Sequence, residues 1–168
     1  MKNKSVIFGL GLVLLSLSFG TAKAQEFGLG VRLGGYTSGI TGKYYMGNSR
    51  AIEGILGTSF GRRGFQLTGL YEIHADALGI QNLQWFYGVG AHIGSFAGRH
   101  YYKRGHKYYH DSYHDQLTTV GIDGIVGLEY QITEIPISVG LDFKPFIDVN
   151  QDGLFLFPDG ALTIRYIF

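Results

Sequence analysis

From residue 27 onward the chain repeatedly alternates large apolar residues with polar residues or glycine. Between Phe27 and Leu33, for example, every second residue is apolar, and the residues between them are glycine or Arg32. A period of two places alternate side chains on opposite faces of an extended strand. Seven clear runs and one weaker run, 40–46, have this pattern, and we predict strands at 27–34, 40–46, 52–60, 65–74, 83–94, 120–130, 137–144 and 162–168.

Strands with one apolar face each predict an all-β fold, namely an eight-stranded antiparallel up-and-down transmembrane β-barrel. Lipid offers the backbone no hydrogen-bond partner, so only a closed sheet can satisfy all of its strands within a bilayer. A soluble barrel with its apolar face inside, as in lipocalins, has the same periodicity and is the alternative.

Two features favour an apolar face on the outside. The polar face is rich in glycine, which leaves room in a narrow lumen, and it carries charges that can pair there away from lipid. We therefore predict a lumen charge network of Arg32, Glu53, Glu72, Asp123, Glu129, Asp142, Lys144 and Arg165. The chain also ends on Phe168, with apolar residues at every second position before it.

The connections between the strands differ in length on the two sides of the sheet. With a periplasmic N-terminus, the short turns 47–50, 75–81 and 133–136 fall on the periplasmic side, and the longer segments 97–115 and 148–158 fall outside. Short periplasmic turns and longer external loops are typical of outer-membrane barrels.

The first 24 residues have the features of a cleaved secretory signal peptide. Lys2 and Lys4 precede an apolar run at 6–19, and Ala22 and Ala24 provide the small residues read at a cleavage site. The run is shorter than the roughly 20 residues that a membrane helix needs. We therefore predict a signal peptide at 1–24 and a single barrel domain at 25–168.

Composition adds limits to this prediction. The 168 residues include 27 glycines and no cysteine, so neither a disulfide nor a thiolate metal site can form. The formal net charge is +1, and removing the three lysines of the first 24 residues leaves −2. Nothing in this charge balance indicates a nucleic-acid partner.

Several stretches resemble a family of short outer-membrane β-barrel proteins, broadly similar to eight-stranded OmpX-like barrels. They are 29–45, 51–57, 64–74, 85–94, 140–145 and the IRYIF ending. The resemblance implies a location in the outer membrane of a Gram-negative bacterium, in contact with lipid and lipopolysaccharide. It also implies that the assembly machinery recognises the C-terminal Phe168. The family has no agreed activity to carry over, and we expect a monomer.

The long segment 97–115 contains a candidate metal site. His106, His110 and His114 recur at every fourth residue, which places them on one face of a helix or a strand. Imidazole is a good ligand for zinc, copper or nickel. The alternative is a solvated rim whose tyrosines and basic residues meet lipid head groups or lipopolysaccharide phosphates.

A second candidate metal site follows the seventh strand. The spacing of Asp148, Asn150, Asp152 and Asp159 matches a calcium-binding loop, with Gly153 at the sharp turn. Asp159 stands where such a loop has a bidentate glutamate, and the flanks are strands instead of helices. A polar hairpin loop rich in turn-forming residues explains the same sequence.

The sequence therefore predicts a non-enzymatic outer-membrane barrel with a structural role or a surface-interaction role through its extracellular loops, and no cofactor. One alternative is a lipid-modifying enzyme, because His110 and Ser112 match a His-x-Ser pair used by one deacylase type. No partner acid for that pair is identifiable. The other alternative is a secreted, lipocalin-like barrel that binds an apolar ligand.

Overall fold

The computed structural model describes residues 27–59, 63–97, 116–150 and 153–168. The predicted signal peptide and the three histidines of the long segment lie outside these residues. No helix in the described part of the chain is long and apolar enough to cross a membrane. The strands are β1 (Phe27–Gly34), β2 (Thr37–Tyr45), β3 (Arg50–Ser59), β4 (Arg63–Asp76), β5 (Leu83–Ala97), β6 (Gln116–Ile132), β7 (Ile137–Asn150) and β8 (Gly153–Ile167).

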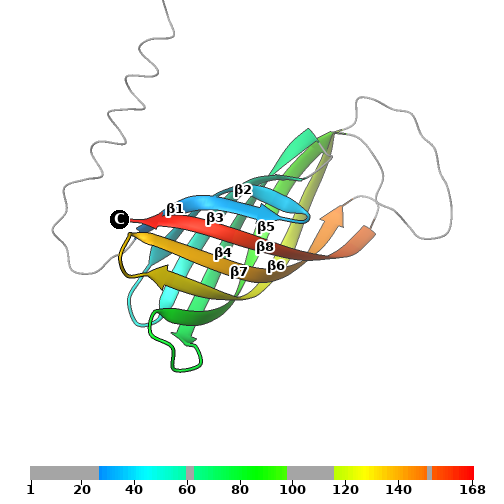
Figure 1. Cartoon of the computed structure of the whole chain (residues 1–168). Coiled ribbons are helices and arrows are strands. Elements are labelled where there is room, and N and C mark those ends of the chain that lie inside the picture. The colour runs from blue at the N-terminus through cyan, green and yellow to red at the C-terminus, as the bar shows by residue number, and fades with distance from the viewer. Residues whose placement is uncertain (1–26, 60–62, 98–115, 151–152) are drawn as a thin grey trace, which may run out of the picture.

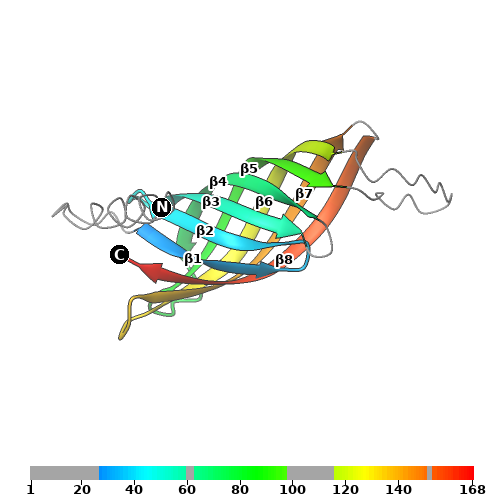
Figure 2. The same cartoon turned by 90° about the horizontal axis from the view of Figure 1, so that it is seen from above.

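The eight strands form one closed barrel, in which each strand pairs antiparallel with its neighbours in sequence (Figures 1 and 2). The first and last strands close the sheet, with Gly28 opposite Ile167. The backbone N–H of Phe168 then donates to the carbonyl oxygen of Phe27 at 2.9 Å. The prediction of an eight-stranded antiparallel up-and-down barrel is confirmed.

The two faces of the sheet have the predicted character. On β1, Arg32 is fully buried, whereas Leu33 beside it is 62% exposed. The same alternation continues along β3, β4, β6, β7 and β8, with polar residues and glycines inside and apolar residues outside. The core of this molecule is therefore the barrel lumen, and it is mostly polar.

The barrel has two distinct ends. The turns 46–49, 77–82 and 133–136 lie at one end, together with the C-terminus, and we call this the short-turn end. Gly47 and Gly79 each have a φ of 66°, in the left-handed region that glycine adopts without strain. β1 and β2 are connected at the opposite end, where β3, β5 and β7 also end, and we call it the loop end (Figure 2).

The prediction of a loop at 148–158 is wrong. In the structure β7 continues to Asn150 and β8 begins at Gly153, and Asp148 lies opposite Phe155 within the ladder. The prediction failed because 154–157 is apolar at four consecutive positions, which hides the period of two. Pro158 lies opposite Pro145, so two residues without an N–H face each other.

Candidate functional site

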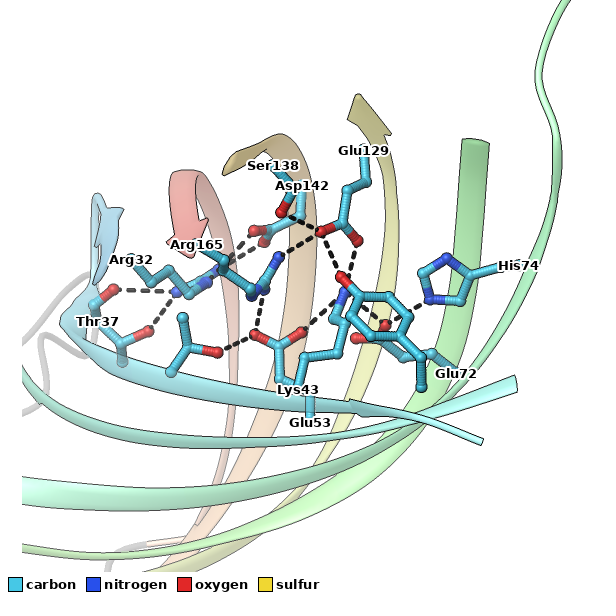
Figure 3. Close-up of polar contacts among 12 residues, drawn as sticks. Arg32, Thr37, Lys43, Glu53, Glu72, His74, Glu129, Ser138, Asp142 and Arg165 are labelled. Atoms are coloured by element: carbon cyan, nitrogen blue, oxygen red, sulfur yellow. Dashed lines mark hydrogen bonds and ion pairs between the residues drawn. The ribbon is translucent and has the colours of Figure 1, made fainter. Parts of the chain in front are cut away.

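The lumen holds all eight side chains of the predicted charge network. Each of them is buried, and none is more than 6% exposed. Figure 3 shows six of them, which point inward from strands far apart in sequence and approach one another, namely Arg32, Glu53, Glu72, Glu129, Asp142 and Arg165. Three groups of contacts can be distinguished, and the following paragraphs describe them in turn.

The central cluster consists of Lys43, Glu53, Glu72, Glu129 and Arg165. Lys43 Nζ lies 3.3 Å from Glu53 Oε2, 2.9 Å from Glu72 Oε2 and 3.1 Å from Glu129 Oε2. Lys43 donates a hydrogen bond to Glu129 Oε2 and forms ion pairs with Glu53 and Glu72. Its ammonium group also lies over the ring of Phe86, with Nζ 4.3 Å from the ring centroid.

Arg165 joins two of the same carboxylates from β8. Its Nη2 donates to Glu53 Oε1 at 2.5 Å, and its Nη1 donates to Glu129 Oε1 at 3.2 Å. Glu129 Oε1 also accepts hydrogen bonds from the hydroxyls of Tyr45 and Ser138, both at 2.7 Å. Glu129 is thus held by two cations and two hydroxyls.

A second group of contacts lies around Arg32 on β1. Arg32 Nη2 donates to Asp142 Oδ1 at 2.6 Å, and its Nη1 donates to Asp159 Oδ2 at 2.9 Å. Asp159 also accepts hydrogen bonds from the Thr37 hydroxyl at 2.6 Å and from the Tyr36 backbone N–H at 2.8 Å. These contacts tie the β1–β2 hairpin to β7 and β8.

The third group surrounds His92 on β5. Its Nδ1 lies 2.6 Å from Asp123 Oδ2, and its Nε2 lies 2.5 Å from Asp148 Oδ1. Lys144 Nζ donates to the other oxygen of Asp123 at 2.7 Å. A neutral imidazole has only one N–H, so hydrogen bonds to both carboxylates require one additional proton in this group.

Apolar side chains fill another part of the lumen. Ile55, Leu70, Phe86 and Ile125 form a buried cluster inside the barrel. The Phe86 ring lies over Gly127, where an added Cβ would come within 2.6 Å of it. Charged groups and packed apolar groups therefore occupy the interior together, in a lumen of the narrow size expected for eight strands.

A polar recess opens this interior at the short-turn end. Its volume is about 180 Å³, and it is lined by Tyr45, Asp76, Asn82, Gln84, Glu129, Gln131 and Ser138. Because Glu129 belongs to the central cluster, the recess leads from the surface to that cluster.

The predicted calcium ligands do not come together in the described residues. Asp148 contacts His92, whereas Asp159 lies opposite Lys144, four residues away along β7. At about 3.3 Å per residue, this register separates the two backbones by roughly 13 Å, too far for a shared ion. Asp152 lies outside the described part of the chain, and so does the side chain of Asn150. Within that part, no group of three or more histidine or acidic side chains could hold a metal ion.

Sequence reasoning missed several inward residues, above all Lys43 and His92. The run 40–46 has few large apolar residues, so neither of its faces could be assigned. The inward direction of Lys43 could have been found from the register of the hairpin, because a tight turn centred on Asn48 places Lys43 opposite Glu53. The alternation in the predicted strand 83–94 places His92 on the polar face. Nothing in the neighbouring sequence, however, indicates that Asp123 and Asp148 flank it.

The outer face carries aromatic residues near the short-turn end. Trp85 and Tyr87 lie with their ring centroids 5.4 Å apart, and Tyr166 and Phe168 lie 4.9 Å apart. The remaining outer positions are mostly aliphatic, and every strand contributes to them. Large apolar residues exposed there include Leu29, Val31, Leu33, Ile40, Ile52, Leu56, Leu67, Val89, Ile93, Ile122, Val126, Leu128, Leu141, Leu156, Leu162 and Ile164.

No protein-family model and no curated protein matches this sequence. Among solved structures, Neisserial surface protein A is similar to it, with 11% sequence identity over 85% of this chain and 95% of that chain and a TM-score of 0.48. The closed eight-stranded barrel agrees with the OmpX-like fold that the sequence resemblance implies.

Proposed function

We propose that this chain is an outer-membrane β-barrel of a Gram-negative bacterium, with a non-enzymatic structural or surface-interaction role. The observation that supports this proposal is the distribution of polarity in the barrel. Apolar side chains cover the outside, whereas the ionised groups lie in the lumen, which is the reverse of a water-soluble domain.

An apolar outer surface of this extent needs an apolar surrounding. Monomeric soluble proteins rarely expose contiguous apolar patches larger than a few hundred Å². Here the exposed aliphatic side chains continue around all eight strands. The aromatic residues near the short-turn end suit the boundary between hydrocarbon and head groups, where an amphipathic ring is favoured.

The alternative of a secreted, lipocalin-like barrel does not fit this interior. Such a protein needs an apolar cavity for its ligand. The described lumen is instead occupied by ion pairs and by the packed Phe86 cluster. The same filling makes an open aqueous pore through the barrel a poor alternative.

Orientation and partners follow from the same proposal. The short-turn end would face the periplasm, and the loop end, where β5 ends at Ala97 and β6 begins at Gln116, would face outward. Lipid and lipopolysaccharide would then surround the barrel, and the long loop would provide the surface interaction. The last strand presents Ile164, Tyr166 and Phe168 outward, as an assembly signal for the outer membrane requires.

The enzyme alternative depends on His110 and Ser112, which lie outside the described residues. Comparing lipid A by mass spectrometry with and without expression of the protein separates the two functions. An altered acyl-chain number would favour the enzyme, and unchanged lipid A would favour the structural role.

Single spin labels test the membrane location, since the chain has no cysteine of its own. We expect labels at Leu67→Cys and Val89→Cys, on outward positions 51% and 68% exposed, to collide with oxygen and to be protected from aqueous relaxation reagents. Leu78→Cys is the matched control, because Leu78 lies on the turn 77–82 and is 86% exposed. Equal accessibility of all three labels to the aqueous reagent would refute the proposal.

A further inference from the structure

The central cluster contains more acids than bases. Three carboxylates, from Glu53, Glu72 and Glu129, surround the two cations of Lys43 and Arg165. No side chain among these five is more than 6% exposed. If all five were ionised, the cluster would hold one uncompensated negative charge away from water, which is costly.

The hydrogen bonds indicate which carboxylates carry the uncompensated negative charge. Both oxygens of Glu129 have donors, since Oε1 accepts from Tyr45, Ser138 and Arg165 and Oε2 accepts from Lys43. By contrast, Glu53 Oε2 and Glu72 Oε1 are buried without a hydrogen-bond partner among the described residues. These two carboxyl groups share Lys43, which lies within 3.3 Å of both.

We propose that Glu53 and Glu72 share one bound proton at neutral pH. The proton makes one of the two a carboxylic acid, whose O–H can donate to the other carboxylate. This donor supplies a partner for the buried oxygens. The cluster then contains two negative and two positive charges and is neutral.

His74 is the other group that could hold this proton. Its Nε2 lies 3.2 Å from Glu72 Oε2, but its Nδ1 is buried without a hydrogen-bond partner. An imidazolium would place an N–H on that nitrogen with no acceptor. The ring also stacks on Phe86, with centroids 5.3 Å apart. The surroundings of His74 therefore offer this proton no acceptor at Nδ1, whereas Glu53 and Glu72 each offer an unpartnered oxygen.

The remaining groups around the pair supply no further positive charge. Thr41 on β2 donates a hydrogen bond to Glu53, and Phe86 on β5 packs against Lys43. On β6, β7 and β8 the facing charged groups are Glu129, Asp142 and Arg165, and Asp142 is an acid that pairs with Arg32. The polar recess at the short-turn end, lined by Tyr45 and Glu129, gives protons a route from bulk water to the cluster.

The proton makes the barrel sensitive to pH. At neutral pH the folded chain holds a proton that glutamates of the unfolded chain release. A folded state that binds more protons loses stability as the pH rises. The contribution is thus present in mildly acidic solution and disappears in alkaline solution, when the three carboxylates face two cations. This inference does not depend on which membrane surrounds the barrel.

Infrared difference spectroscopy of the folded barrel in detergent tests the proposal directly. Glu72→Gln removes the shared proton but keeps a hydrogen-bond donor and an acceptor in its place. Glu134→Gln, on the exposed turn 133–136, is the matched control. We expect the spectrum of the wild type minus that of Glu72→Gln at neutral pH to show the carbonyl band of a protonated carboxylic acid. The corresponding spectrum for Glu134→Gln should lack it.

Urea unfolding provides the second readout. The urea midpoint of the wild type should fall between about pH 6 and about pH 9, and the fall should be smaller for Glu72→Gln but unchanged for Glu134→Gln. Absence of the carboxylic acid band from the Glu72→Gln difference overturns the proposal. If Glu72→Gln does not fold, Glu53→Gln takes its place. A wild-type spectrum without any carboxylic acid band is by itself enough to overturn the proposal.

Discussion

Replacing Lys43 with methionine should destabilise the barrel more than any other single loss of charge in the lumen. Methionine keeps the length and the apolar stem but removes the ammonium that contacts three carboxylates. It leaves Arg165 as the one cation in the central cluster, because Arg32 and Lys144 pair with other acids.

The size of the effect follows from the geometry of those contacts. At about 3 Å and an effective dielectric constant of about 20, each contact is worth about 5 kcal/mol of attraction. Most of this attraction offsets the desolvation of the four groups and is not net stability. Removing one partner leaves the desolvation of the carboxylates uncompensated, at a cost of about 3 to 5 kcal/mol. With a urea m-value of about 2 kcal/mol/M, the midpoint falls by about 2 M.

The measurement is urea unfolding of the barrel in lipid vesicles, followed by the fluorescence of Trp85, the single tryptophan of the chain. Arg50→Met is the matched control, because Arg50 is an exposed cation at the start of β3, and this change should alter the free energy of unfolding by less than about 0.5 kcal/mol. A Lys43→Met variant as stable as Arg50→Met would refute the view that the lumen charges hold the barrel together.

Two further predictions concern other parts of the barrel. Gly121→Ala should cost at least about 2 kcal/mol or prevent folding, because the added methyl would overlap the Ile147 carbonyl and the His92 ring. Gly69→Ala, with open space around its Cβ, should change the free energy of unfolding by less than about 0.5 kcal/mol. His92 should carry a proton on each ring nitrogen at neutral pH, since each nitrogen faces a carboxylate. Nitrogen-15 NMR, assigned by the signal lost in His92→Asn, measures this, and the spectrum of a neutral tautomer would contradict it.

Much of the fold could be predicted because alternation is a local property of a strand. The faces of β1 could be read from Phe27 to Leu33 alone, and charges such as Arg32 and Glu53 indicated which face points into the lumen. The hairpin at 150–153 could not be predicted, because consecutive apolar residues conceal a period of two. The weak run 40–46 likewise hid the inward direction of Lys43.

The sequence alone therefore determined the number of strands, the inner and outer faces of all but the weak run 40–46, and the identity of most lumen charges. The tertiary structure decided which charges meet. Arg32 contacts Asp142 and Asp159, which are 110 and 127 residues away, and Lys43 reaches Glu129 across the lumen. Such contacts depend on the register of every strand pair and on closure of β1 against β8, so no local stretch of sequence contains them.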